Sequence, residues 1–265
     1  MYDHSITRSL ALSTGSYDIL RRLKRRFLRR DEVEALNNDV RFYSQLLPSE
    51  PLCFDVGANI GVKAEAMLEA GAEVVAIEPQ LDLIPRLEAR CSSLGKMSVI
   101  AAGAADEPGI RLLRKHESQG RTSFRGDWPG TTVETREAAV ITLDMVIEFH
   151  GVPDYIKIDV EGYEYEVVSG LSSVPNVLSI EFHEDRVEEV KTGECLRRLN
   201  RLGYKKANVT GANSLKFLYD KWIDIEKLGQ MLPDLLPESE THRRGDIFVT
   251  HSDTVIERTD RSNRP

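Results

Sequence analysis

Three consecutive segments of residues 52–79 have regular patterns of apolar and polar positions. They are an apolar run, an amphipathic helical pattern and a second apolar run: Leu52–Phe54, Ile60–Ala70 and Val74–Ile77. Gly71 follows the helical pattern and suits the left-handed conformation that often ends a helix. Short apolar runs on either side of a helical period predict a strand, a helix and a second, parallel strand.

The same alternation continues along the chain. Beyond Glu78 it predicts a helix and then a third strand, and it resumes after residue 150 with two strands that end on Asp159 and His183. Residues 110–141 break the rhythm, because they predict two strands around a polar loop, Lys115–Thr132. This insertion would either cover a substrate or be an exposed decoration. The pattern as a whole predicts an α/β protein.

The turn between the first strand and the first helix carries candidate chemistry. Gly57 and Gly61 allow close approach of the backbone to a ligand, and the helix that follows directs its N–H groups to the same place. Asp55 and Glu78 end neighbouring parallel strands, where open α/β sheets bind ligands. A carboxylate at the first strand would repel a pyrophosphate but suits S-adenosylmethionine, which carries an ammonium and a sulfonium.

Other ligands remain open at this point. Glu78 lies 21 residues after Gly57, which is also the spacing of the acid that binds ribose in dinucleotide sites. The glycines, however, are spaced G-x-x-x-G rather than G-x-G-x-x-G. A βαβ unit without any ligand is the third reading.

Lys157 lies inside a predicted central strand and requires a partner, because an unpaired buried ammonium is costly. The next strand contains Glu181. We therefore predict an ion pair between Lys157 and Glu181.

Composition limits the classes of function. The chain has 265 residues and a net charge of −8, which argues against general nucleic-acid binding. Its three cysteines lie in predicted elements without metal-like spacing, so we expect reduced core thiols and a cytoplasmic protein. No apolar run is long enough to span a bilayer, and no integral membrane segment is expected.

The N-terminal region differs from the rest in charge. Seven cations within Arg21–Arg30 surround a thin apolar stripe, so this predicted helix would either contact an anionic surface or cover the domain as a solvated helix. We expect a helical extension over residues 1–50, one domain over residues 51–251 and a disordered tail over residues 252–265.

Two blocks of sequence resemble a known family. DVGANIG is followed by AIEP, and ITLDMVI is followed by PDYIKIDVEGYE and VLSIEFH. Together they closely resemble the FkbM-type family of S-adenosylmethionine-dependent methyltransferases, over roughly residues 51–250. The resemblance implies a class I methyltransferase, or Rossmann-like, fold with a seven-stranded, mostly parallel sheet and helices on both faces. It also implies O-methylation of a small-molecule or glycan acceptor, such as a sugar or a polyketide-like metabolite.

Site residues follow from the motifs together with this resemblance. For the donor we expect Glu78 to bind the ribose, Asp55 and the turn of Gly57, Asn59 and Gly61 to bind the methionine end, and Asp106 to reach the adenine. Asp106 also fits a simple turn. The catalytic candidates stand at the ends of the fourth and fifth strands: Asp159, Glu161 and His183.

Among these candidates we expect His183 to be the general base and Asp159 to position the acceptor, because a histidine has a suitable pKa. The alternative for His183 is a local hydrogen bond at a strand end. A divalent metal held by Asp159, Glu161, Glu181 and His183 is a further, less favoured possibility.

Two other functions compete with methyl transfer. A nicotinamide-dependent oxidoreductase shares the βαβ unit and the acid at position 78. A non-catalytic scaffold recruited through the basic N-terminal helix would require neither motif. Whichever function holds, a homodimer is the default expectation, because two-fold dimers are the commonest soluble oligomers.

Overall fold

A computed structural model describes residues 30–117, 122–127, 131–183, 186–211, 214–232 and 244–262. The chain divides into two compact units, Met1–Asn38 and Asp39–Pro265. The basic stretch Arg21–Arg30 lies outside the described residues, except that Arg30 begins helix α3. The expected extension over residues 1–50 and domain over residues 51–251 stay predictions.

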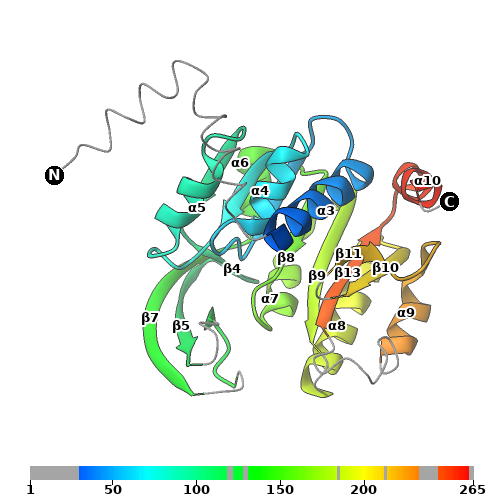
Figure 1. Cartoon of the computed structure of the whole chain (residues 1–265). Helices are drawn as coiled ribbons and strands as arrows, with labels where there is room; N and C mark the ends of the chain where they lie inside the picture. The colour runs from blue at the N-terminus through cyan, green and yellow to red at the C-terminus, as the bar shows by residue number, and fades with distance from the viewer. Residues whose placement is uncertain are drawn as a thin grey trace, which may run out of the picture. The chain divides into compact units, whose positions relative to one another are not determined.

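Nine strands of the described chain form one mixed sheet (Figure 1). Their order is β11-β10-β13-β9-β8-β1-β2-β3, and β12 pairs with β10. These strands are β1 Leu52–Val56, β2 Glu73–Ile77, β3 Met97–Ile100, β8 Tyr155–Ile158, β9 Val177–His183, β10 Lys206–Gly211, β11 Ser214–Phe217, β12 Ile223–Asp224 and β13 Arg244–Thr250.

This sheet corrects the expected fold in part. The α/β class is confirmed, and five adjacent strands run parallel to one another: β3, β2, β1, β8 and β9. The expectation of seven mostly parallel strands is wrong. β13 is antiparallel to both β9 and β10, and β11 and β12 each pair antiparallel with β10. The chain turns back on itself beyond β10, which adds strands at that edge.

Helices cover both faces of the sheet (Figure 1). The described helices are α3 Arg30–Leu46, α4 Val62–Glu69, α5 Ile84–Cys91, α6 Leu143–His150, α7 Glu164–Ser169, α8 Arg186–Leu202, α9 Ile225–Met231 and α10 Asp253–Ser262. On one face, apolar strand residues such as Phe54 and Ile156 pack in one cluster with residues of α6 to α9 such as Val146 and Leu196. This cluster is the main hydrophobic core.

The other face mixes aromatic and ionisable side chains. Tyr43 of α3 packs against Tyr155 of β8, with ring centroids 5.7 Å apart. Lys157 follows on the same face two residues later, paired in register with Asp55 of β1 and Ser179 of β9. The sheet is therefore apolar on one side. On the other side it carries a buried polar row that consists of Asp55, Lys157 and Ser179.

A second sheet has the order β4-β7-β5-β6. Its strands are β4 Gly103–Ala104, β5 Gly109–His116, β6 Thr122–Ser123 and β7 Thr132–Ile141. The two predicted strands within residues 110–141 are confirmed as the antiparallel pair β5 and β7. Because the Ala105 N–H donates to the Ile141 carbonyl at 2.9 Å, this insertion leaves and rejoins the main fold at one point.

The C-terminal region is more ordered than expected. The tail after residue 251 was predicted to be disordered, but it contains α10, and the Trp222 indole N–H donates to Thr259 Oγ1 at 2.7 Å in a buried position. Val255 of this helix is buried, so α10 has an apolar contact that the mostly polar sequence of the tail does not indicate.

Two other expectations concern the cysteines and the membrane. Cys53, Cys91 and Cys195 are free and buried, as predicted. Within the described ranges, no helix combines the length and the apolar character that crossing a bilayer requires.

Candidate active site

The turn after β1 is built from left-handed residues. Gly57, Asn59 and Gly61 have φ values of 83°, 51° and 80°. A Cβ at position 57 would collide with the carbonyl oxygen of Asp159, so glycine is required there by both conformation and space. At position 61 a Cβ would meet Leu87 Cδ1 at 2.5 Å. The two sequence motifs are therefore in direct backbone contact.

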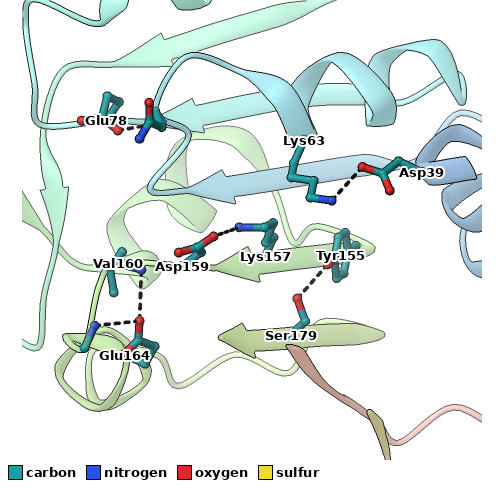
Figure 2. Close-up of polar contacts among 11 residues, drawn as sticks. Asp39, Lys63, Glu78, Tyr155, Lys157, Asp159, Val160, Glu164 and Ser179 are labelled. Atoms are coloured by element: carbon teal, nitrogen blue, oxygen red, sulfur yellow. Dashed lines mark hydrogen bonds and ion pairs between the residues drawn. The ribbon is translucent and has the colours of Figure 1, made fainter. Parts of the chain in front are cut away.

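Glu78 lies beside this turn, one residue beyond β2. Its carboxylate is 2 % exposed and accepts two backbone hydrogen bonds, each 2.8 Å long. The Asn59 N–H donates to Oε2 (Figure 2), and the Gln80 N–H donates to Oε1. Burial raises the pKa of Glu78, while the N–H groups of Gln80 and Asn59 oppose the rise. The carboxylate is thus fixed in place with lone pairs left to bind hydroxyl groups.

Asp55 faces the buried polar row. It is 1 % exposed, and neither of its carboxylate oxygens has a well-formed hydrogen bond among the described residues, although the Ala64 N–H is near enough to lower its pKa. Burial raises the pKa of Asp55, whereas the nearby Lys157 lowers it. A buried carboxylate without well-formed hydrogen bonds is costly, so this side chain is suited to receive a cationic or hydrogen-bonding ligand.

Lys157 ties the row to the end of β8. Its Nζ donates to Asp159 Oδ2 at 2.7 Å, and the ammonium is nearly fully buried (Figure 2). Burial opposes the charged form, but the carboxylates of Asp159, Asp55 and Asp246 together raise the pKa of Lys157. The predicted ion pair with Glu181 is wrong, since Lys157 lies opposite Ser179 and its carboxylate partner is Asp159 of the same strand end.

The turn that follows β8 has two more left-handed residues, Glu161 with φ 53° and Gly162 with φ 86°. The Glu164 side chain holds this turn closed, because its Oε1 accepts the N–H groups of Val160 at 3.1 Å and Gly162 at 3.2 Å (Figure 2). Burial raises the pKa of Glu164 to about 8. Asp159 and Glu161, one on each side of Val160, are thereby held at the sheet edge.

Several acids crowd the ends of β8 and β9. Burial raises the pKa of Glu181, and its hydrogen-bonded neighbour Asp159 raises it further. Among the described residues no group of three or more His, Cys, Asp or Glu side chains has a metal-binding arrangement. The His183 side chain, one of the four candidate ligands, lies outside the described residues.

The predicted site residues are thus brought together unequally. Asp55, the turn of residues 57–61, Glu78 and Asp159 lie around the ends of β1, β2 and β8. His183 is the last residue of β9, in register with Arg244, and its role stays a prediction. Asp106 lies after β4 and is exposed, and its Oδ1 lies 3.6 Å from Nη2 of Arg111 in β5.

The second sheet contacts the loops of the site directly. Thr122 Oγ1 donates to Gln80 Oε1 at 2.9 Å, and Ser123 Oγ donates to the Glu161 carbonyl at 2.8 Å. Phe124 packs on Tyr163 with ring centroids 5.6 Å apart. The insertion therefore adjoins the loop after β2 and the loop after β8.

Sequence reasoning missed Glu164, Gln80 and Thr122. Glu164 has a signal, because an acid in the first turn of a helix commonly caps the N–H groups before it. Gln80 lies two residues after Glu78, but no motif in the sequence identifies it as a site residue. No local pattern connects Thr122 with Gln80, since 42 residues separate them.

Among solved structures the chain resembles magnesium protoporphyrin IX methyltransferase from Synechocystis PCC 6803 with bound S-adenosylmethionine, with 14% identity, a TM-score of 0.44, and coverage of 94% of this chain and 98% of that one. Fibrillarin from Aeropyrum pernix matches with 11% identity, a TM-score of 0.44, and coverage of 80% and 76%. An rRNA methylase from Streptococcus thermophilus matches with 11% identity, a TM-score of 0.41, and coverage of 80% and 92%. No curated protein matches the sequence.

The family model is more specific than these distant similarities. The model named Methyltransferase FkbM domain matches residues 55–206, more than half of the chain. The match begins at Asp55 and includes Glu78, Asp159 and the insertion. The chain therefore belongs to the FkbM methyltransferase domain family, and it is a methyltransferase.

Proposed function

We propose that this methyltransferase uses S-adenosylmethionine to methylate a hydroxyl group of a sugar, a glycan or a polyketide-like metabolite. The observation that carries the donor assignment is the pair of buried carboxylates, Asp55 and Glu78, on either side of the turn of residues 57–61. β1 lies between β2 and β8, and the order of strands reverses there, because β2 and β3 extend the sheet on one side of β1 and β8 and β9 on the other. Ligands of open α/β sheets bind at such a point.

The residues present fit this donor. The Asp55 oxygens lack well-formed hydrogen bonds among the described residues, which suits the ammonium of the methionine end. Glu78 is held by two N–H groups at 2.8 Å, which suits a ribose diol. When bound, the donor supplies an electrophilic methyl group on sulfur.

On the acceptor side, the chain must hold a hydroxyl oxygen in line with that methyl group and remove its proton. Asp159 is anchored through Oδ2 to Lys157 and is one-third exposed, so it can position a hydroxyl group at the end of β8. We retain His183 as the proposed general base, because it ends the neighbouring strand and an imidazole titrates near neutral pH. Glu161 is the third candidate.

The acceptor class rests on the resemblance of the IKIDVEG motif to its family. Transfer of a labelled methyl group to a panel of hydroxylated glycans and polyketides tests it. If labelled product appears only on a nitrogen or carbon acceptor, the O-methylation proposal is incorrect.

The donor assignment is tested by isothermal titration of the purified chain with S-adenosylhomocysteine, with and without magnesium. We expect saturable binding near one per chain. Glu78→Ala should weaken binding 10- to 100-fold, because hydrogen bonds to a charged group contribute roughly 1.5–3 kcal/mol.

Glu73→Ala is the matched control for this titration. Glu73 begins β2 and is exposed. Among the described residues its Oε2 pairs with Nζ of the exposed Lys96 at 3.3 Å, so its loss should leave binding unchanged. No binding by folded wild-type protein would refute the donor assignment, and fluorescence titration with reduced nicotinamide cofactor would then test the oxidoreductase alternative. A magnesium dependence would support the metal alternative.

A further inference from the structure

A side-chain contact joins the second sheet to the loop after β2. The Thr122 hydroxyl of β6 donates to Gln80 Oε1 at 2.9 Å. Gln80 is 8 % exposed, so its side chain is enclosed at this point. A buried amide that accepts from a hydroxyl on one side has its NH₂ group directed elsewhere.

Gln80 acts in turn on Glu78. Its backbone N–H donates to Glu78 Oε1 at 2.8 Å, and its side chain is close enough to help lower the pKa of that carboxyl group. The other carboxylate oxygen is fixed by Asn59 of the turn. Glu78 is therefore oriented from two directions, by the turn after β1 and by a residue that the insertion holds.

We propose that Thr122 is a positioning residue for the ribose of the methyl donor, acting through Gln80 on the Glu78 carboxylate. This inference rests on the proposed donor site. A ribose diol needs both carboxylate oxygens at fixed places, so small displacements of Glu78 cost affinity for the diol specifically. The insertion thus contributes to donor binding although its residues lie outside the βαβ unit.

A simple docking role for Thr122 predicts something different. Arg136 of β7 also ties the second sheet to this loop, with Nη2 3.0 Å from Asp82 Oδ1. If Thr122 only attached the sheet, its loss would resemble the loss of Arg136 and would not depend on the ribose hydroxyls. The two roles are separated by comparing a ligand that has the diol with one that lacks it.

The experiment titrates the full chain with S-adenosylhomocysteine and with its 2′-deoxy analogue. We expect wild-type protein to prefer the ribose ligand at least 10-fold. Thr122→Val should reduce this preference 3- to 10-fold, because valine keeps the shape and removes the hydroxyl. Thr122→Ser keeps the hydroxyl that donates to Gln80 and should retain the preference for the ribose ligand. Arg136→Met should also retain this preference.

Three results would overturn the inference. If Thr122→Val weakens both ligands equally, or neither, Thr122 does not act on the ribose site. If circular dichroism shows that Thr122→Val does not fold, Gln80→Met breaks the same link and must show the same loss of preference for the ribose ligand. A Gln80→Met protein that is unfolded, or that keeps the full preference for the ribose ligand, refutes the proposal. Failure of wild-type protein to bind S-adenosylhomocysteine refutes the donor assignment itself, a result distinct from an unchanged preference in the variants.

Discussion

Replacing Glu164 with glutamine should change how the stability of the protein depends on pH. Burial raises the pKa of Glu164 from 4.5 to about 8, so the folded protein keeps a proton that the unfolded chain releases. Stability from this group is complete below about pH 4.5 and is lost as the pH rises towards 8. Glutamine cannot ionise, yet its Oε1 can still accept the N–H groups of Val160 and Gly162.

The magnitude follows from the width of this window. At about 1.4 kcal/mol per pH unit, the full shift corresponds to a change on the order of 5 kcal/mol in the free energy of unfolding. Glu164→Gln should therefore gain stability relative to wild type as the pH rises. Between pH 5 and pH 8 the relative gain should approach 4 kcal/mol, by the same conversion.

Urea denaturation at pH 5, 6, 7 and 8 measures this difference. With an m value of about 2–3 kcal/mol/M, the midpoint of the variant should move by more than 1 M relative to wild type across the series. The comparison at pH 5 is the internal reference, since it contains any cost of the substitution itself. A difference between the two proteins that stays flat from pH 5 to pH 8 would refute the reasoning.

Three further substitutions test other parts of the structure by urea denaturation. Gly57→Ala should destabilise the fold by at least about 2 kcal/mol more than Gly71→Ala. Both positions have positive φ, but only at position 57 would the new Cβ collide with the Asp159 carbonyl. Equal losses of stability in the two variants would contradict the clash. Lys157→Met should cost roughly 3–5 kcal/mol at pH 7, since it leaves buried carboxylates without their cation, and a loss below 1 kcal/mol would contradict the ion-pair assignment. Thr259→Val removes the acceptor of a buried indole N–H and should cost about 1–3 kcal/mol, whereas an unchanged midpoint would mean that α10 does not anchor there.

The sequence predicted the βαβ unit and its glycines because those features are local. A turn that needs left-handed residues selects glycine at positions 57 and 61, and strand ends are marked by the polar residues that follow apolar runs. The same local reasoning did not find the left-handed Glu161. That conformation is held by the Glu164 side chain and by Ser123, which lies 38 residues earlier.

The errors had physical causes as well. Lys157 needed an anion, and the sequence offered both Glu181 and Asp159. Only the parallel register, which places Lys157 opposite Ser179, excludes Glu181 as the opposite residue. The short strand β12 and the helix α10 depend on tertiary contacts, such as the bond between Trp222 and Thr259, that no periodicity contains.

The closure of the insertion at Ala105 and Ile141 has a consequence for how this fold can change. Because both ends of the insertion are hydrogen-bonded to each other, its length can vary without moving any strand of the main sheet, and longer loops add little entropic cost. A segment of different length or sequence could therefore stand beside the loops after β2 and β8 while the main sheet stays unchanged. Grafting a different insertion at Ala105 and Ile141 would change what adjoins these loops while leaving Asp55 and Asp159 where they are.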